Sequence, residues 1–456
     1  MSGLNTRIES MTRQRTLSVV VVAYAYAGLL VAGPWIFTMV GIFGLSSTQC
    51  SLNCDQLTLF RSIVIYNSLF SLVVTSPLSF FAGRHVSDRL YVGESGCIFY
   101  VFLVVVAIFC AVTLVTAVPF YLVAATLEGP TRFAAVQNVF LIGVSWLLMP
   151  FLGVLRAYTP LLLAFGLNAL AMVLIGLLLS DPPATSLIIT FNVGFAITDS
   201  ILVWVLVRRV GTHIERSQNL FRSFMKYPEL PAAGLAYAVG IWGDKVIMWF
   251  STGHLTVGGV LSTMPSYDTA MFWAQLASIP VIAVAFVHIE TQLSVLLRRF
   301  YGRLDKHITL REMTTQMQKL RACIISSIAT LFVALGIVAA MTILLSFVFM
   351  SQLGLKPSYM SILRIALWAM ACHTSSMFCF VFFLYFDLRR QALVIVSLYA
   401  ALSTTITLAL LPLGEAFYGY GALTASAITF VTAFGMLLRE LPWLHYHAFV
   451  SNNTSL

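Results

Sequence analysis

Residues 97–126 have the sequence CIFYVFLVVVAIFCAVTLVTAVPFYLVAAT, which contains no charged side chain. A helix needs about 20 mostly apolar residues to cross the hydrocarbon core of a bilayer, so this stretch predicts a transmembrane helix. The same composition extends over the chain, since 59% of its 456 residues are apolar and 9% are charged. In soluble domains about a quarter of all residues are charged. The chain is therefore expected to be a membrane protein without a sizeable soluble domain.

Further charge-poor runs, bounded by charges, turns, or Gly and Pro, predict an all-α polytopic membrane protein with about twelve spans. The predicted spans are 17–43, 58–83, 97–126, 133–155, 159–180, 184–206, 231–253, 269–297, 322–349, 359–386, 391–412 and 419–438. The first run is too long for the apolar core of a signal peptide and lacks a cleavage pattern, so we expect it to be retained.

The basic residues indicate the orientation of these spans. If the N-terminus is cytoplasmic, most of the 26 Lys and Arg residues lie at cytoplasmic ends, and only Arg61, Arg132 and Lys356 lie in outer loops. This bias predicts that both termini are cytoplasmic. The net charge of +9 is then a topology signal, and we expect no nucleic-acid partner.

The chain is expected to divide near its midpoint. Residues 1–206 and 231–438 each hold six predicted spans, a size typical of transporters built from two halves. Residues 207–230 form the predicted cytoplasmic linker, and 439–456 a cytoplasmic tail. Within the second half, apolar residues at helical spacing predict that 301–321 is a short amphipathic helix on the membrane surface.

Ionisable side chains inside spans are the most informative residues, because each costs at least about 2.5 kcal/mol to insert and so faces a partner or a wet cavity. Most of them lie in the second half of the chain. They are Asp199, Asp244, Lys245, His288, Glu290, Arg364 and His373.

In the seventh predicted span, Trp242, Lys245 and Trp249 share one helix face. Asp244 is rotated by about 100° from Lys245, so these neighbours are not expected to pair. One interpretation is a cavity wall, with indoles that stack on sugar rings and Asp244 as a hydrogen-bond acceptor. The other is that these charges pair with another helix and hold the bundle together.

Prolines and one loop provide further candidates. Pro34, beside Trp35, and Pro280 are predicted helix-break positions of the kind that line transport pathways or act as hinges. Glu290 lies about 12 Å from the cytoplasmic end of its span, where it could serve an entrance or pair with a basic residue. Cys50 and Cys54 share the first outer loop and are either bridged or two free thiols.

Several catalytic patterns are absent from the sequence. It contains no GxxxxGK[ST], GxSxG, HExxH or CxxC, so we expect no catalytic residues, metal or cofactor, and no ATPase activity. A polytopic membrane acyltransferase that uses His373 as a base is the alternative from a different class.

Four segments resemble a known family. They are AYAYAGLLVAGPWIF at 23–37, GIWGDK at 240–245, HIETQ at 288–292 and YFDLRR at 385–390. They are similar to the exporters of the Pel exopolysaccharide system, within the multidrug/oligosaccharidyl-lipid/polysaccharide (MOP) exporter superfamily. The resemblance covers essentially the whole chain, and it implies two six-helix lobes around a central cavity lined by spans one, two, seven and eight.

The resemblance also implies a function. It implies export of a nascent polysaccharide rich in N-acetylgalactosamine to the periplasm for biofilm matrix formation. The implied partners are a cytoplasmic glycosyltransferase and small membrane proteins of the same system. Trp35, Trp242 and Trp249 would suit a neutral polymer, and Asp244 and Glu290 are available for ion coupling. The alternative within transport is an ion-coupled flippase for lipid-linked oligosaccharides or a drug antiporter.

Overall fold

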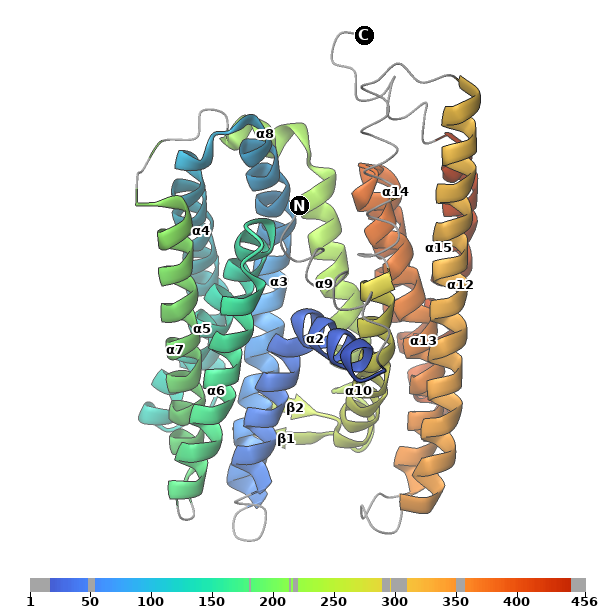
Figure 1. Cartoon of the computed structure of the whole chain (residues 1–456). Coiled ribbons are helices and arrows are strands. Elements are labelled where there is room, and N and C mark those ends of the chain that lie inside the picture. The colour runs from blue at the N-terminus through green and yellow to red at the C-terminus, as the bar shows by residue number, and fades with distance from the viewer. Residues whose placement is uncertain are drawn as a thin grey trace. The chain divides into compact units, whose positions relative to one another are not determined.

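The computed structural model describes residues 17–47, 54–179, 182–212, 215, 220–288, 296, 310–349 and 357–443, and almost all of them are helical. The helices are α2 (Leu17–Ser47), α3 (Cys54–Val92), α4 (Ile98–Pro119), α5 (Gly129–Val154), α6 (Tyr158–Leu178), α7 (Ala184–Val210), α8 (Leu220–Lys226), α9 (Glu229–Met248), α10 (Pro265–His288), α12 (Leu310–Phe349), α13 (Pro357–Tyr385), α14 (Arg389–Leu410) and α15 (Tyr420–Glu440). Strands β1 (Leu255–Val257) and β2 (Leu261–Thr263) form an antiparallel hairpin, and the π-helical segment Phe120–Ala124 follows α4 (Figure 1).

Each predicted span coincides with a helix. Among the described residues, ten helices are long and apolar enough to cross a membrane. The other two predicted spans correspond to α2 and α9. In α2 the segment Ala32–Leu45 is a shorter apolar helix. Helix α9 has twenty residues, of which three are charged. The all-α polytopic class is confirmed, whereas the number twelve stays a prediction.

The chain forms two compact units, one of residues 33–265 and one of residues 1–32 with 266–456. The predicted division placed the seventh span with the second half. In the structure its helix, α9, packs along α3 and belongs to the unit formed by 33–265. The boundary inside the first helix lies between Ala32 and Gly33. The predicted six-helix lobes stay a prediction.

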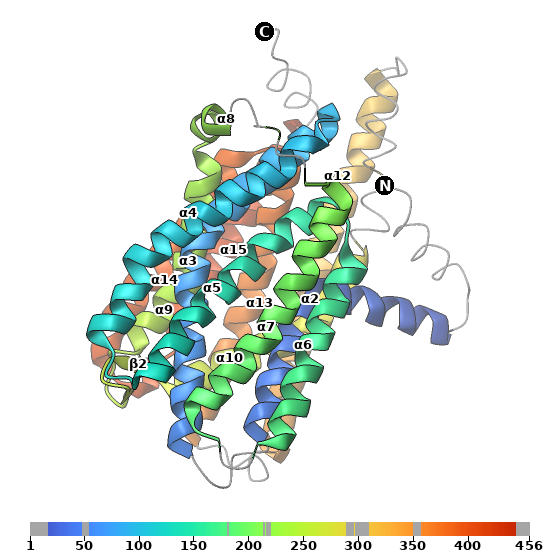
Figure 2. The ribbon, with the colours of Figure 1, turned by 90° about the vertical axis from the view of Figure 1, so that its left-hand side faces the viewer.

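In the 33–265 unit, α3, α5 and α7 pack side by side (Figure 2). Polar contacts join α5 to α7 at intervals of seven residues: Thr131 to Thr185, Asn138 to Asn192, and Ser145 to Asp199. Because both residue numbers increase together, the two helices are parallel and stay in register over four turns. The repeat of seven keeps these small polar groups on one seam of each helix.

The β-hairpin is attached to the same unit. The hydroxyl of Tyr66 donates to the carbonyl of Ser262 at 2.9 Å and accepts from its backbone N–H at 3.0 Å. The backbone N–H of Thr126 donates to Gly258 at 2.9 Å. Gly258 has a φ of +58°, a conformation in which side chains with a Cβ are strained. The hairpin is therefore fixed at both its turn and its second strand.

In the other unit, α15 packs against α13 and α14, and its small residues Ala425 and Ser426 are fully buried. Residues 310–321, predicted as the second half of a separate surface helix, continue without a break into the span as α12. Leu320 is 1% exposed and Met317 is 7% exposed, so their apolar face is packed inside the protein. Residues 301–309 lie outside the described part of the chain.

Candidate transport site

Helix α9 carries the candidates Trp242, Asp244 and Lys245, and a close approach to α3 sets its position. Pro77 lies inside α3. A Cβ built at Gly234 would lie 2.5 Å from the backbone oxygen of Ser76 and 2.8 Å from the Cα of Pro77. Glycine is thus required for the two backbones to meet here, and this contact fixes the depth of the residues further along α9.

Trp242 on α9 and Trp249, the residue that caps the C-terminal end of this helix, differ in exposure. Trp242 is half-buried, whereas Trp249 is 2% exposed. Their ring centroids lie 6.2 Å apart, and the Trp249 ring stacks on Tyr66 of α3 at 4.8 Å. Tyr66 in turn stacks on Phe120 at 5.7 Å. Trp242 thus presents the accessible ring of the pair, and Trp249 belongs to a packed aromatic row.

Asp244 and Lys245 form an ion pair, which corrects the expectation that these neighbours would not face each other. The ammonium Nζ of Lys245 lies 3.4 Å from Oδ1 of Asp244 and donates to the carbonyl of Ile241 at 2.7 Å. The long lysine side chain folds back over its own helix turn and so crosses the 100° between the two Cβ directions. The Asp244 side chain is 3% exposed and that of Lys245 is 21% exposed.

Next to the aromatic row lies a chain of buried amides that the sequence analysis missed. The hydroxyl of Tyr121 donates to Asn67 at 2.5 Å, and Asn67 donates to Oδ1 of Asn138 at 2.8 Å. Asn138 donates to Asn192 at 2.7 Å, and Asn192 donates to the carbonyl of Ala134 at 2.9 Å. The three asparagines are at most 2% exposed. Their partners keep each amide satisfied in an apolar bundle.

The first helix supplies Trp35, which is half-buried. Cβ atoms at Gly33 and Gly44 would collide with Leu162 and Val173 of α6, so these glycines mark the face of α2 that packs on α6. Trp35 is about 200° from Gly33 around the helix and therefore lies on the opposite face. Trp35 and Trp242 are therefore candidates on two different helices.

Pro34 and Pro280 lie inside α2 and α10, and neither proline ends its helix. Thr38 donates its hydroxyl to the carbonyl of Pro34 at 2.8 Å. Pro34 is buried and Pro280 is exposed. Their role as kinks or hinges stays a prediction.

Other candidates lie away from α9 or outside the described residues. Glu290 and Cys50 are outside that part of the chain, as is the side chain of Cys54, so neither the entrance nor the disulfide is tested. His373 packs its ring on Tyr399 at 4.4 Å. Arg364 is exposed and lies over the ring of Phe347 at 4.4 Å.

In the described part of the chain, no group of three His, Cys, Asp or Glu side chains is arranged to hold a metal ion. The α9 region combines one accessible indole, one internally neutralised ion pair and a rigid aromatic support. Such a surface can offer stacking and dispersed hydrogen bonds to a neutral, hydroxyl-rich molecule, and it presents no unbalanced charge on these residues.

Comparisons with known proteins agree with a transporter fold. The family model of the PelG exopolysaccharide exporters (EPS-E) matches residues 1–449. No curated protein gives a significant match. Several solved structures are similar in fold at low identity, and three of them follow.

The outward-facing conformation of a multidrug-resistance MATE transporter of the MOP superfamily is 13% identical, with a TM-score of 0.62, 92% of this chain covered and 96% of that chain. The inward-facing conformation of such a transporter is 12% identical, with a TM-score of 0.61 and coverages of 92% and 99%. A MOP transporter from Pyrococcus furiosus, described as having a binding pocket of reverse polarity, is 12% identical, with a TM-score of 0.61 and coverages of 92% and 95%.

Proposed function

Because the chain belongs to the PelG exopolysaccharide exporter family, we propose that it moves a nascent polysaccharide from a cytoplasmic glycosyltransferase across the bacterial inner membrane. The match over residues 1–449 is the observation that carries this proposal. The MOP-type fold supports a transporter role, since similar structures cover 92% of the chain. The polymer is of the Pel type, rich in N-acetylgalactosamine, and is destined for a biofilm matrix.

The polymer is expected to slide past the accessible part of the half-buried Trp242 ring. A neutral acetylated chain needs weak, repeated contacts, because a tightly binding charged pocket would hold it in place. Trp242 offers such a face, while the Asp244–Lys245 pair leaves no net charge beside it. Trp249, at 2% exposure, supports the indole of Trp242. Trp35 is a second candidate platform on α2.

The energy source for movement must lie outside this chain. The sequence contains no P-loop, so elongation by the synthase or an ion gradient drives movement. We propose that the synthase and small membrane proteins of the same system form a complex with this chain, and that both of its termini are cytoplasmic.

Trp242→Ala tests the proposed contact. We expect normal protein abundance and a loss of polymer secretion of about two- to fivefold, because an exposed aromatic contact contributes about 0.5–1 kcal/mol. Trp204→Ala is a matched control, since Trp204 is 56% exposed on α7 and lies beside Arg208 at the end of that helix. Equal secretion by both variants at equal abundance would remove Trp242 from the transport path.

The alternative of an ion-coupled flippase or antiporter predicts transport without a synthase. The acyltransferase alternative predicts loss of a covalent product in His373→Ala with transport unchanged. Secretion that depends on the glycosyltransferase and persists in His373→Ala favours the exporter over both.

A further inference from the structure

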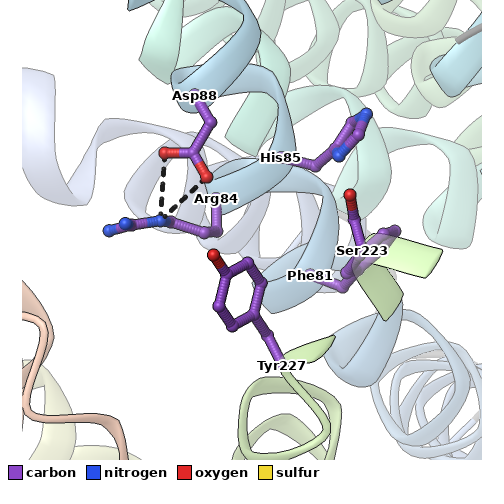
Figure 3. Close-up of a pocket in the computed structure, with 6 residues that line it drawn as sticks. All are labelled: Phe81, Arg84, His85, Asp88, Ser223 and Tyr227. Carbon is purple, nitrogen blue, oxygen red and sulfur yellow. Dashed lines mark hydrogen bonds and ion pairs between the residues drawn. The ribbon is translucent and has the colours of Figure 1, made fainter. Parts of the chain in front are cut away.

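We propose that the corner between α3 and α8 binds the headgroup of an anionic phospholipid. A shallow, open-sided hollow lies there, lined by Phe81, Arg84, His85, Asp88, Ser223 and Tyr227 (Figure 3). Figure 3 shows Arg84 and Asp88 joined above Tyr227, with Phe81 beside Ser223. This proposal is independent of what the protein transports.

Helix α8 lies across the ends of α3 and α9 in Figure 1 and is viewed nearly end-on in Figure 2. Phe224 attaches it to α3 through an edge-on contact with Phe81, with ring centroids 5.2 Å apart. Phe221 and Met225, one turn apart, remain 74% and 59% exposed. An in-plane helix with an exposed apolar stripe is typical of a segment that rests in the membrane interface.

The depth of the pocket agrees with that placement. Gly83 of α3 approaches Pro150 of α5. The polar contacts between α5 and α7 join residues 54 positions apart, so Pro150 lies level with Trp204 of α7. Arg208 lies over the ring of Trp204, with 4.6 Å from its Cζ to the ring centroid. Tryptophan and arginine together mark the boundary between hydrocarbon and headgroups. The polar groups of the pocket, which begin one residue after Gly83, therefore lie at headgroup level.

The charges of this corner favour an anionic headgroup. Arg84 and Asp88 neutralise each other through an ion pair of 3.1 Å. Arg222 and Lys226 are exposed on α8, beside the apolar stripe, and add positive charge. Lys226 lies 5.2 Å from the ring of Tyr227, which brings its ammonium to the edge of the pocket. Hydroxyl groups of the Ser223 and Tyr227 type can donate to phosphate oxygens.

A lipid explains these features together better than a protein partner does. At the end of the spans, basic side chains lie beside an exposed apolar stripe, as expected at the surface of a leaflet. Phe221 and Met225 would contact acyl chains, and Arg222 and Lys226 would contact phosphates. A docked protein would have to cover the apolar residues with an apolar surface and also provide acidic groups for Arg222 and Lys226, whereas an anionic lipid provides both.

The test uses the purified full-length protein and native mass spectrometry with phosphatidylglycerol and phosphatidylcholine at equal concentrations. We expect the wild type to retain phosphatidylglycerol preferentially, and Arg222→Gln/Lys226→Gln to bind it about tenfold more weakly. The control, Arg321→Gln/Arg439→Gln, removes two exposed charges from the other compact unit and is expected to bind as the wild type does.

Phe221→Ser provides a second variant, since a residue 74% exposed can be changed without affecting folding. We expect it to shorten lipid retention with no loss of thermal stability. Equal phosphatidylglycerol binding by the wild type and Arg222→Gln/Lys226→Gln would overturn the proposal, as would equal loss in the two double variants. The first result would leave this face to a protein partner.

Discussion

Gly234 shows how a single residue positions the candidate site. Gly234→Ala is expected to lower the yield of folded protein, because the new Cβ would lie 2.5 Å from the backbone oxygen of Ser76, and backbone atoms cannot move aside as a side chain can. Gly83→Ala is the control, since its Cβ would meet only Pro150 at 3.9 Å. Retention of fluorescence-tagged protein on size exclusion after heating measures both. Equal thermal stability of the two variants would contradict the close approach of α9 to α3.

The ion pair on α9 gives the second residue-scale prediction. Lys245→Met removes the ammonium that lies 3.4 Å from the carboxylate of Asp244, whose side chain is 3% exposed. We expect the free energy of unfolding to fall by about 2–3 kcal/mol. This is less than for a fully buried pair, because Lys245 is partly exposed. Asp244→Asn/Lys245→Met removes both charges and should recover most of this stability. If the double variant is no more stable than Lys245→Met, the pair is not the main partner of Asp244.

At the scale of elements, the contacts between α5 and α7 predict that these helices do not move relative to each other during transport. Thr131 and Thr185 bring their hydroxyl oxygens to 2.5 Å, so Thr131→Cys/Thr185→Cys should form a disulfide under oxidation. We expect the oxidised variant to secrete polymer as well as the reduced one. Secretion that stops on oxidation and returns on reduction would show that the seam must open.

Much of the element pattern could be predicted from the sequence, because long charge-poor runs leave few alternatives to a helix in a membrane. The run 184–206 was expected to be a span, and α7 covers Ala184–Val210. The β-hairpin at 255–263 was missed, since its short strands lie in a loop and depend on a contact with Tyr66, far away in the chain. The joining of 310–321 to α12 was missed because the charges suggested a surface segment.

The site was predicted only in part, for a related reason. Ionisable residues stand out in an apolar span, so the sequence indicates Asp244 and Lys245 but not the uncharged Asn67, Asn138 and Asn192. These amides are uncharged and their partners lie 54 or 71 positions away. The signal that could have found the α5–α7 pairs is the shared spacing of seven residues in two spans. The exposure of individual side chains could not be predicted from the sequence either. Trp242 and Trp249 share a helix face, but only Trp249 is fully packed.

At the scale of the whole molecule, the family match and the two compact units describe a membrane transporter that has no P-loop of its own. The proposed coupling to synthesis predicts that its activity depends on an enzyme that makes the polymer. This dependence separates an exporter coupled to synthesis from a flippase or antiporter that works alone on a finished substrate.

The most direct measurement uses inverted inner-membrane vesicles that contain the glycosyltransferase and its small membrane partners, supplied with radiolabelled sugar nucleotide. With this chain present, we predict that newly made polymer enters the vesicle lumen and resists an added glycosidase until detergent opens the membrane. Without the chain, the polymer should be digested at once. Polymer that is equally protected in both preparations, or digested equally in both, would contradict the account.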